Sequence, residues 1–520
     1  MSWTAWFVFF LIVQVVHFAG TWKLYKKAGR EAWEAAVPVY NAVVLMKIIN
    51  RPWWWTLLLF IPIVNLIMFP VIWVETIRSF GRNSAVDTFL VLITFGLYIF
   101  YINYTQDVQH IKDRSLQPRT SAGEWVSSIL FAVVAATIVH AYFIQPYTIP
   151  TSSLEKTLLV GDFLFVSKFH YGARAPMTSV AFPMVHDTIP LVKTKSYFNK
   201  PQFPYLRLPG FQNIKRNDIV VFNWPVDTVN AFQTASDGKY YYKPIDKKSN
   251  YVKRAVGIPG DSLEVRDGRV YINGALNQLP DRAKIQHAYI VRVNSRINHE
   301  IIYNRYGITD MYSFNDNSNT YLFPGVSEEA LQMLKNNPNV IDIIPFKKDA
   351  GEWDRSAFPY NPTYPWNNDN MGPLYIPKQG ATVAINSETI PFYKRIIEVY
   401  EGSELGIENK ITQSGTEVLL NGNPITEYTF KMDYYWMMGD NRSNSEDART
   451  WGYVPYNHVV GKPVFIWMSW DGFNKKVRWD RVFTTVGGSG QPTSYFMYFV
   501  IAVGLWFAYS TFRKRKKKTS

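Results

Sequence analysis

The sequence predicts a mainly β domain that α-helical segments hold in a membrane, and three observations lead to this fold class. Short runs rich in β-branched and aromatic residues, broken by Gly, Asn, Asp and Pro, indicate strands at 218–224, 251–258, 263–274 and 462–470. Long apolar runs occupy much of the first 150 residues and recur near the end. Residues 278–372 are rich in Asn, Pro and aromatic side chains with weak periodicity, which predicts a subdomain inserted between strands.

The apolar runs are the candidates for membrane spans. Crossing ~30 Å of hydrocarbon takes about 20 residues. The runs at 53–74 and 125–144 meet this length, and those at about 3–19 and 88–104 are at its lower limit. A further run, 494–512, precedes a basic end. The apolar segment 35–49 is interrupted by Pro38 and Lys47, which favours an interfacial or re-entrant segment.

Positive charges beside these runs predict their orientation. Basic residues follow the first run and the last run, and basic residues mark the cytoplasmic side of a span; they are Lys23, Lys26, Lys27, Arg30 and the cluster 513–518. This places the N-terminus outside, residues 145–493 outside the cytoplasmic membrane and the tail 513–520 inside. The loop 75–87, expected outside, carries Arg78 and Arg82 against the rule. The first run lacks the basic n-region of a cleavable signal peptide.

Composition excludes several kinds of chemistry. The formal net charge of +14 is concentrated beside apolar runs, so the basic balance needs no nucleic-acid partner. The absence of cysteine excludes disulfides, thiol catalysis and Cys-ligated metal. The eight histidines are scattered, and His299-Glu300 lacks the second His of a zinc-binding HExxH helix. A hydrolase with this sequence would work without His or Cys, and we expect no metal and no cofactor.

Local patterns predict several elements. Asp267-Gly268 in "DGRVYING" predicts a hairpin turn, and "SEEALQMLKNN" predicts a helix beginning at Ser327. The segment 251–278, "YVKRAVG…VYINGALNQ", is echoed at 392–428 by "FYKRIIE…VLLNGNPITEY". This echo is either a structural duplication or chance, and it supplies a second Lys-Arg pair at 394–395.

The stretch "IPTSSLEKTLLVGDFLFVSK" (149–168) contains two adjacent serines that admit two interpretations. Ser152 with Glu155 fits a capping box at the start of a short helix. Alternatively, one serine is a nucleophile activated by a neutral lysine. The pKa of that lysine must fall from ~10.4 towards 7, which burial can achieve. In "YVKRAVG" the strand period puts Lys253 between uncharged neighbours and turns Arg254 to the other face. The alternative for Lys253 is an exposed lysine at a strand edge.

Four blocks together resemble the bacterial type I signal peptidases (leader peptidases), which are membrane-anchored serine–lysine proteases. They are "QPYTIPTSSLEKTLLVGDFLFVSK", "RNDIVVFNWP", "YVKRAVGIPGD" and "MMGDNRSNSEDARTWGYVP" with the following "VVGKPVFIWMSWD". The resemblance spans residues 144–483. The chain departs from the family pattern at Leu154, where Met is usual, and at Lys156, where Pro is usual. The insertion, the C-terminal span and residues 1–120 are further departures.

The resemblance implies a role for each matching position. The nucleophile falls on Ser153, the general base on Lys253, and the hydroxyl that orients the lysine on Ser445. Thr151 and the Ser153 backbone N–H would hold the oxyanion. Lys394 matches the echo but is not followed by "GIPGD", so Lys253 is the better candidate base. Structural support falls on Asp440, Asn441, Asp447 and Arg449. Shallow apolar substrate pockets, with core packing as the alternative, fall on Ile149, Pro150, Leu154, Leu158, Tyr251 and Val252.

The implied organisation is a signal-peptidase-type β catalytic domain with an inserted subdomain and transmembrane helices. The parts are a multi-span membrane region of unknown role at 1–120, a transmembrane helix at 121–144, an extracytoplasmic peptidase domain at 145–277 and 373–493, the insertion at 278–372, a transmembrane helix at 494–512 and a basic cytoplasmic tail at 513–520.

The implied function is a serine endopeptidase of the bacterial cytoplasmic (inner) membrane. It would remove signal peptides from exported preproteins after small residues at −1 and −3. Its partners would be the preproteins and the lipid bilayer, with the protein translocation machinery as a further candidate and no nucleic acid. Two alternatives remain open: a non-enzymatic scaffold, whose mark would be a broken dyad, and a peptidase for a narrow set of partners selected by the insertion.

Overall fold

The computed structural model describes residues 1–118, 120–229, 239–314 and 319–519, and these form two compact units. The first unit comprises Met1–Phe143, Arg174–Arg207 and Thr228–Lys247; the second comprises Ile144–Ala173, Leu208–Asp227 and Lys248–Ser520. The expected peptidase range 145–277 is thus divided, because two of its segments cluster with the N-terminal helices. Each unit is described by itself.

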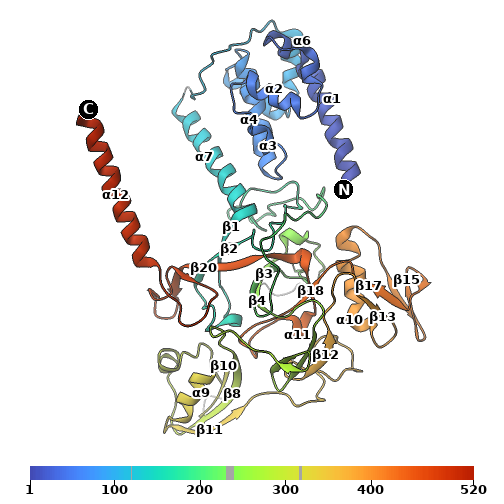
Figure 1. Ribbon diagram of the computed structural model, residues 1–520, viewed down its shortest axis with the longest axis vertical. Coiled ribbons are helices and arrows are strands. Elements are labelled where there is room, and N and C mark those ends of the chain that lie inside the picture. Colours follow the sequence, from blue (N-terminus) through green and yellow to red (C-terminus); the bar gives the residue numbers. More distant parts are fainter. Residues whose placement is uncertain (119, 230–238, 315–318, 520) are drawn as a thin grey trace. The chain divides into compact units, whose positions relative to one another are not determined.

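The first unit is helical (Figure 1). Buried apolar side chains such as Leu24, Val44, Ile72 and Ile102 form one core among the helices before residue 109. A buried carboxylate, Glu75, accepts hydrogen bonds from two arginines of this unit. The helices are α1 (Trp3–Lys27), α2 (Tyr40–Ile48), α3 (Trp55–Leu58), α4 (Val64–Ser79), α5 (Ala85–Ile93), α6 (Tyr98–Thr105) and α7 (Ser121–Ile138), with short 3₁₀ turns at Ala32–Ala35 and Ile245–Lys247 and a π-turn at Val139–Phe143.

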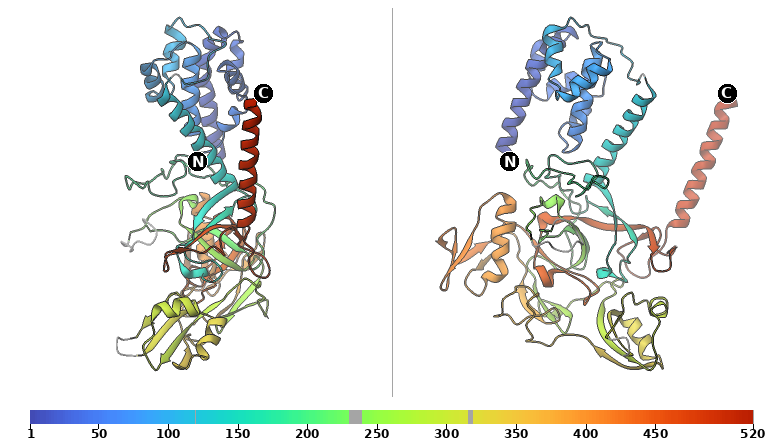
Figure 2. Two further views of the ribbon diagram at one scale, coloured as in Figure 1. Left: turned by 90° about the vertical axis from the view of Figure 1, so that its left-hand side faces the viewer. Right: turned by 180° about the vertical axis from the view of Figure 1, so that it is seen from behind.

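Among the described residues, three helices are long and apolar enough to cross a membrane: Trp3–Lys27, Ser121–Phe143 and Phe496–Arg513. Figure 2 shows α1 and α12 (Phe496–Thr519) as long unbroken helices. The bent pair α5 and α6, which meet at 119°, would be a fourth span or a re-entrant loop. The predicted tail 513–520 continues α12 as far as Thr519, and Ser520 lies outside the described residues.

The prediction of a single span over 53–74 is wrong. The run is split between α3 and α4, and Ile63 at the start of α4 has a positive φ of 71°. Pro62 explains the break, because proline lacks the backbone N–H and disfavours helix in the preceding residue. The run 88–104, which contains no proline, is also broken, at Phe95 and Gly96, both of which have positive φ.

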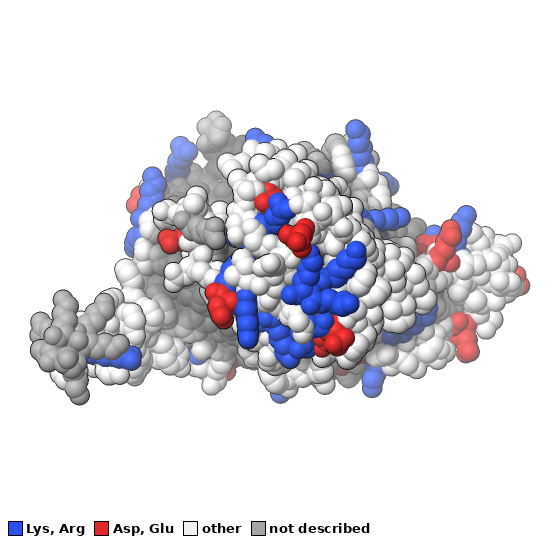
Figure 3. All heavy atoms as spheres, turned by 90° about the horizontal axis from the view of Figure 1, so that it is seen from above, with Lys and Arg blue, Asp and Glu red and all other residues white. Residues whose placement is uncertain are grey.

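Lys and Arg side chains gather at one end of the first unit. Figure 3 looks onto this end, where α1 stops, and shows the basic side chains grouped there. Lys26 and Lys27 in the last turn of α1 and Lys47 in α2 are exposed. The opposite end of α1 contacts the segment Arg174–Arg207, where Trp6 stacks on Phe203 with ring centroids 4.2 Å apart.

The second unit is built on a curled antiparallel sheet in the order β1-β2-β20-β3-β4-β18-β19, with β21 and β22 also paired to β20. β20 pairs with β3 near its start and with β2 further along, and register shifts in both pairings curl the sheet. All four strand regions expected from the sequence are confirmed. The bounds are β1 (Ile144–Thr148), β2 (Asp162–Ser167), β3 (Ile219–Asn223), β4 (Asn250–Gly257), β18 (Tyr434–Met438), β19 (Val454–Pro455), β20 (Val459–Asp471), β21 (Lys476–Val477) and β22 (Thr484–Thr485).

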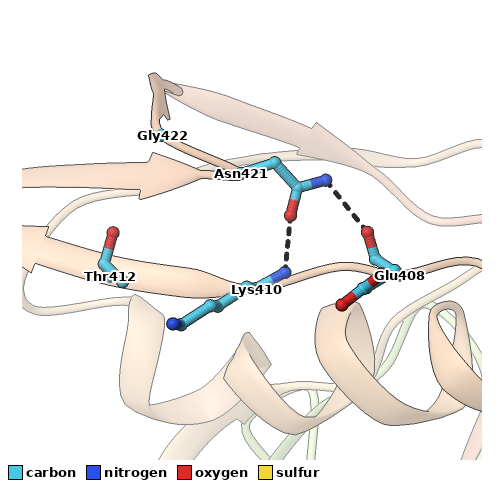
Figure 4. A pocket seen from close by; sticks show the side chains of 5 residues that line it. All are labelled: Glu408, Lys410, Thr412, Asn421 and Gly422. Carbon is cyan, nitrogen blue, oxygen red and sulfur yellow. Dashed lines mark hydrogen bonds between the residues drawn. The ribbon is translucent and has the colours of Figure 1, made fainter.

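The sequence echo corresponds to a real repeat in one half only. "VYINGAL" and "VLLNGNP" each form a meander that turns at an Asn-Gly pair with positive φ, at 273–274 and 421–422. Figure 4 shows the second turn, where Asn421 accepts from the Lys410 backbone N–H and donates to the Glu408 carbonyl. The Lys-Arg halves differ, because "YVKR" lies in β4 and "FYKR" in helix α10 (Ile390–Arg395).

These meanders and their neighbours have the following bounds: β5 (Ser262–Arg266), β6 (Arg269–Ile272), β7 (Ala275–Leu276), β12 (Met371–Tyr375), β13 (Thr382–Ala384), β14 (Ile411–Ser414), β15 (Glu417–Leu420), β16 (Asn423–Pro424), β17 (Glu427–Thr429), α11 (Ala448–Trp451), the 3₁₀ turns Ser403–Leu405 and Tyr456–His458 and a π-turn at Ile396–Tyr400. The predicted hairpin at Asp267-Gly268 is confirmed between β5 and β6.

The insertion has its own sheet, in the order β11-β8-β10-β9, with a separate apolar core that includes Val291, Phe323 and Leu334. Its elements, coloured yellow in Figure 1, are β8 (Gln286–Val293), α8 (His299–Ile301), the π-turn η5 (Ile302–Tyr306), β9 (Tyr312–Ser313), β10 (Thr320–Ser327), α9 (Glu328–Lys335) and β11 (Val340–Pro345). The predicted helix is confirmed as α9, capped by the Ser327 side chain.

Candidate active site

Ser153 and Lys253, which are 100 residues apart in the chain, meet in the second unit. Lys253 lies in β4, and Ser153 lies in a 3₁₀ turn, η3 (Ser152–Leu154), that follows β1. Lys253 Nζ donates a hydrogen bond to Ser153 Oγ at 2.7 Å. Both residues are buried, at 3% and 7% exposure. Once Nζ loses its proton, the same contact allows the amine to accept the proton of the hydroxyl.

Burial makes that loss possible near neutral pH. It lowers the pKa of Lys253 from 10.5 to about 8, because the charged ammonium loses contact with water. The carboxylates of Asp447 and Glu446 oppose this shift, and the Arg449 guanidinium assists it. The sequence argument that a lysine base requires burial in an uncharged strand face therefore agrees with the position of Lys253.

The closing block places a buried ion pair beside the dyad. Asp447 accepts from Arg449 through both carboxylate oxygens, at 2.9 and 2.8 Å, and from the Gly439 backbone N–H at 3.0 Å. Burial alone would raise the pKa of Asp447, but Arg449 reverses this and keeps it below its ordinary value. The carboxylate therefore stays charged near Lys253.

Ser445 lies close to the nucleophile without touching the lysine through a hydrogen bond. Its Oγ is buried and has no hydrogen-bond partner among the described residues. Gly439 separates it from Ser153: a Cβ at Gly439 would lie 2.2 Å from Ser445 Oγ and 2.5 Å from the Ser153 carbonyl oxygen. The orienting role that the resemblance implies for Ser445 therefore stays a prediction.

Asn441 holds the nucleophile turn through hydrogen bonds, and the neighbouring Asp440 pairs with a buried arginine. The Asn441 backbone N–H donates to the Ser153 carbonyl at 3.1 Å, and its side chain donates to the Ser152 carbonyl at 3.2 Å. Asp440 receives a bidentate hydrogen bond from Arg254, at 2.7 and 2.6 Å. Arg254 is a supporting residue that sequence reasoning missed. The strand period indicated only that Arg254 points away from Lys253, and nothing in the sequence marked Asp440 as its partner.

The capping-box interpretation of Ser152 and Glu155 is wrong. The segment forms a single 3₁₀ turn, in which Thr151 holds the N-cap position and Ser152 is already inside. Glu155 ends the turn and is buried, and burial raises its pKa to about 7. Thr151 is exposed, and its hydroxyl bonds to no described residue, so it is available to a substrate.

The expected pocket residues divide into two groups. Ile149, Leu154 and Leu158 are fully buried in one apolar cluster, at 4%, 1% and 0% exposure, as core packing requires. Pro150 is exposed, and Tyr251 and Val252 are half-buried. The ring of Tyr251 stacks on Trp224 and lies 5.2 Å from Lys253 Nζ. Among the accessible members of the set, Tyr251 therefore lies beside the lysine of the dyad. Lys394, the other candidate base, is exposed on α10.

Comparison with known proteins shows the family to which this chain belongs. The model of the family described as signal peptidase, peptidase S26, matches residues 122–295 and 331–470. The chain belongs to the signal peptidase S26 family. It is therefore a peptidase, and its candidate spans make this S26 peptidase membrane-bound. A second model, of a family of unknown function (DUF5684), matches residues 33–113.

Curated relatives of this S26 peptidase are bacterial. Signal peptidase I of Buchnera aphidicola subsp. Schizaphis graminum is 25% identical over 346 residues, which cover 66% of this chain and 75% of the relative. Signal peptidase I of Helicobacter pylori is 25% identical over 376 residues, 70% of this chain and 92% of the relative. That of Haemophilus influenzae is 23% identical over 386 residues, 71% of this chain and 78% of the relative. The resemblance to type I signal peptidases is confirmed.

Proposed function

We propose that the protein removes signal peptides from exported preproteins with Ser153 as nucleophile and Lys253 as general base. The 2.7 Å contact between Lys253 Nζ and Ser153 Oγ, in a buried setting that lowers the pKa of the lysine, carries this proposal. Family membership and the names of the relatives, all signal peptidase I, support the substrate class.

The proposed reaction has two steps. Ser153 Oγ attacks the scissile carbonyl carbon while neutral Lys253 takes the hydroxyl proton, and the resulting ammonium gives a proton to the leaving amine. The Ser153 backbone N–H and the Thr151 hydroxyl would donate to the oxyanion, a contribution of several kcal/mol. Water then hydrolyses the acyl ester of Ser153, with Lys253 again neutral and acting as base. Ser445 would orient the lysine during both steps.

Specificity for small residues at −1 and −3 would arise from shallow pockets. Because Ile149, Leu154 and Leu158 are buried, they would leave little depth behind the substrate, and the more accessible Pro150 and Val252 would form the wall of its path. Large side chains would be rejected by steric clash. The substrate backbone would bind as an added strand beside 149–151, the mode called β-augmentation.

The proposed location is the outer face of the bacterial cytoplasmic membrane. The basic side chains grouped at the end of the first unit where α1 stops support a cytoplasmic position for that end (Figure 3). Ser153 follows Ile144 by nine positions, at most ~30 Å of extended chain, so the active site would lie close to the bilayer that α7 leaves. The translocation machinery remains a candidate partner.

Cleavage of defined preproteins by the full-length protein in phospholipid vesicles tests this function. The substrates carry Ala at −1 and −3, or Phe at either position, and mass spectrometry of the product locates the cut. We expect cleavage after the Ala pair, loss of cleavage with Phe, loss in Lys253→Ala and full activity in Lys394→Ala. A wild-type protein that leaves every preprotein intact would overturn the proposal, as would an active Lys253→Ala variant.

A further inference from the structure

A carboxylate of the insertion reaches the turn that carries the nucleophile. Asp310 lies between η5 and β9, and its Oδ2 accepts from Asn444 Nδ2 at 3.1 Å and from Ser152 Oγ at 3.4 Å. Asn444 Nδ2 also donates to Ser152 Oγ at 3.1 Å. The three side chains close a ring in which each amide hydrogen and the serine hydroxyl hydrogen has an acceptor.

The ring joins the turn that carries Ser153 to the loop that carries Ser445. Ser152 directly precedes Ser153, and Asn444 directly precedes Ser445. Lys253 lies in a strand of the main sheet, whereas Ser153 lies in a single 3₁₀ turn, which has few hydrogen bonds of its own. The distance from Oγ to Nζ therefore depends on what holds this turn.

The insertion also holds both loops through its first strand. The Gln286 backbone N–H donates to the Asp440 carbonyl at 2.9 Å, and its carbonyl accepts from the Arg442 N–H at 2.9 Å. The Gln286 side-chain amide donates to the Glu155 carbonyl. Gly325 in β10 packs so closely that a Cβ there would lie 2.8 Å from the Asn441 amide nitrogen.

Further contacts hold the inserted subdomain against the catalytic domain near the nucleophile turn. Gly307, at the end of η5, leaves room for Lys156: a Cβ there would lie 2.3 Å from Lys156 Nζ. Tyr303 donates to Asp471 Oδ1 at 2.9 Å and stacks on Phe473 with ring centroids 4.4 Å apart. With Gly325, which follows Asp310 in the chain, these contacts fix the subdomain to the catalytic domain on both sides of Asp310. The carboxylate of Asp310 therefore has a defined position.

We propose that Asp310 is a positioning residue, through which the inserted subdomain holds the nucleophile turn at the distance from Lys253 that the reaction requires. This inference rests on the proposed function. The largest charges acting on the pKa of Lys253 are those of Asp447, Glu446, Arg449 and Asp440, so Asp310 acts on geometry rather than on that pKa. A small displacement of a reacting group can cost up to ~100-fold in rate.

Steady-state kinetics of full-length variants in vesicles tests the inference. Asp310→Ala removes the acceptor, and we expect kcat to fall about tenfold with KM within about twofold, since a slightly displaced nucleophile slows the chemical step and leaves substrate binding unchanged. Asp310→Asn keeps an acceptor and should retain most of kcat. In a double-mutant cycle, Ser152→Gly should add less than twofold to the loss in Asp310→Ala, because both changes open the same ring.

Asp342→Ala is the matched control, since this carboxylate of β11 pairs with Arg292 at the surface of the same subdomain; its kinetics should equal those of the wild type. Unchanged kcat in Asp310→Ala, or a rise in KM alone, would overturn the inference. Additive losses in the cycle would do the same. If wild type cleaves no preprotein, the proposed function fails; if wild type cleaves and Asp310→Ala matches it, only the positioning role fails.

A charge exchange between Asp310 and Asn444 tests the same pairing if the Asp310→Ala variant does not fold. Asn444→Asp would place a second carboxylate against Asp310 at the 3.1 Å contact and should lower kcat by like-charge repulsion. Combining it with Asp310→Asn restores one amide donor and one carboxylate acceptor, and we expect kcat to recover. Failure of the exchange to restore kcat would contradict the pairing.

Discussion

Glu446 offers a direct test of how the site sets the pKa of its lysine. This residue is exposed, although partial burial raises the pKa of its carboxyl, and its charge is one of the two that most favour the ammonium form of Lys253. Glu446→Gln removes that charge, so the pKa of Lys253 falls and the lysine is neutral at lower pH. The acidic limb of the kcat/KM profile, which reports the pKa of the base in the free enzyme, should move to lower pH.

The size of the effect follows from the pKa of about 8 for Lys253. At pH 7 about one-tenth of such lysines are neutral, and a fall of one pKa unit would raise this to about one-half. We therefore expect kcat/KM to rise up to about fivefold at pH 7 and to stay unchanged above about pH 9.

The assay is preprotein cleavage from pH 5.5 to 10 by the full-length protein in vesicles. Glu417→Gln, in an exposed carboxylate of β15, is the control and should leave the profile in place. A limb that moves to higher pH in Glu446→Gln would refute the electrostatic reasoning. An equal loss of kcat/KM at every pH would also refute it, because that would indicate a displaced nucleophile instead.

Three further predictions concern the loops around the dyad. Gly439→Ala should abolish cleavage, because its Cβ would lie 2.5 Å from the Ser153 carbonyl oxygen, and an active variant would contradict this packing. Asp447→Asn should lower the free energy of unfolding by about 3–5 kcal/mol, since the substitution leaves the buried Arg449 charge unpaired. Denaturant unfolding measures this free energy, and a loss under about 1 kcal/mol would contradict the prediction. Glu155, with its pKa raised from 4.5 to about 7, contributes stability below pH 4.5 that is lost as pH rises through 7. The Tm of Glu155→Gln relative to wild type should therefore increase from pH 4.5 to pH 8, and a constant difference would contradict this.

Sequence reasoning succeeded where a local pattern sufficed. The runs around Ile219, Lys253 and Val270 alternate or carry β-branched side chains, and each is a strand. The blocks with their characteristic order identified the family and directed attention to Ser153 and Lys253, which the structure brings to hydrogen-bond distance.

It failed where long-range contacts decide the conformation. Ser152 and Glu155 have the spacing of a capping box, but Ser152 interacts with Asp310 and Glu155 is buried, so no α-helix follows. "FYKR" shares its Lys-Arg pair with "YVKR" but is helical, and its Tyr393 packs into a different apolar cluster. The part played by Asp310 could not be predicted, since it depends on a ring closed across more than 130 residues of chain.

The central claim is that Ser153, and not its neighbour Ser152, is the nucleophile. Its most direct test compares preprotein cleavage by Ser153→Ala and Ser152→Ala in the full-length protein, with equal amounts in vesicles and equal Tm. The account predicts no cleavage by Ser153→Ala and retained, though reduced, cleavage by Ser152→Ala, which loses only its contacts to Asp310 and Asn444. Cleavage by Ser153→Ala at a rate near that of the wild type would contradict it.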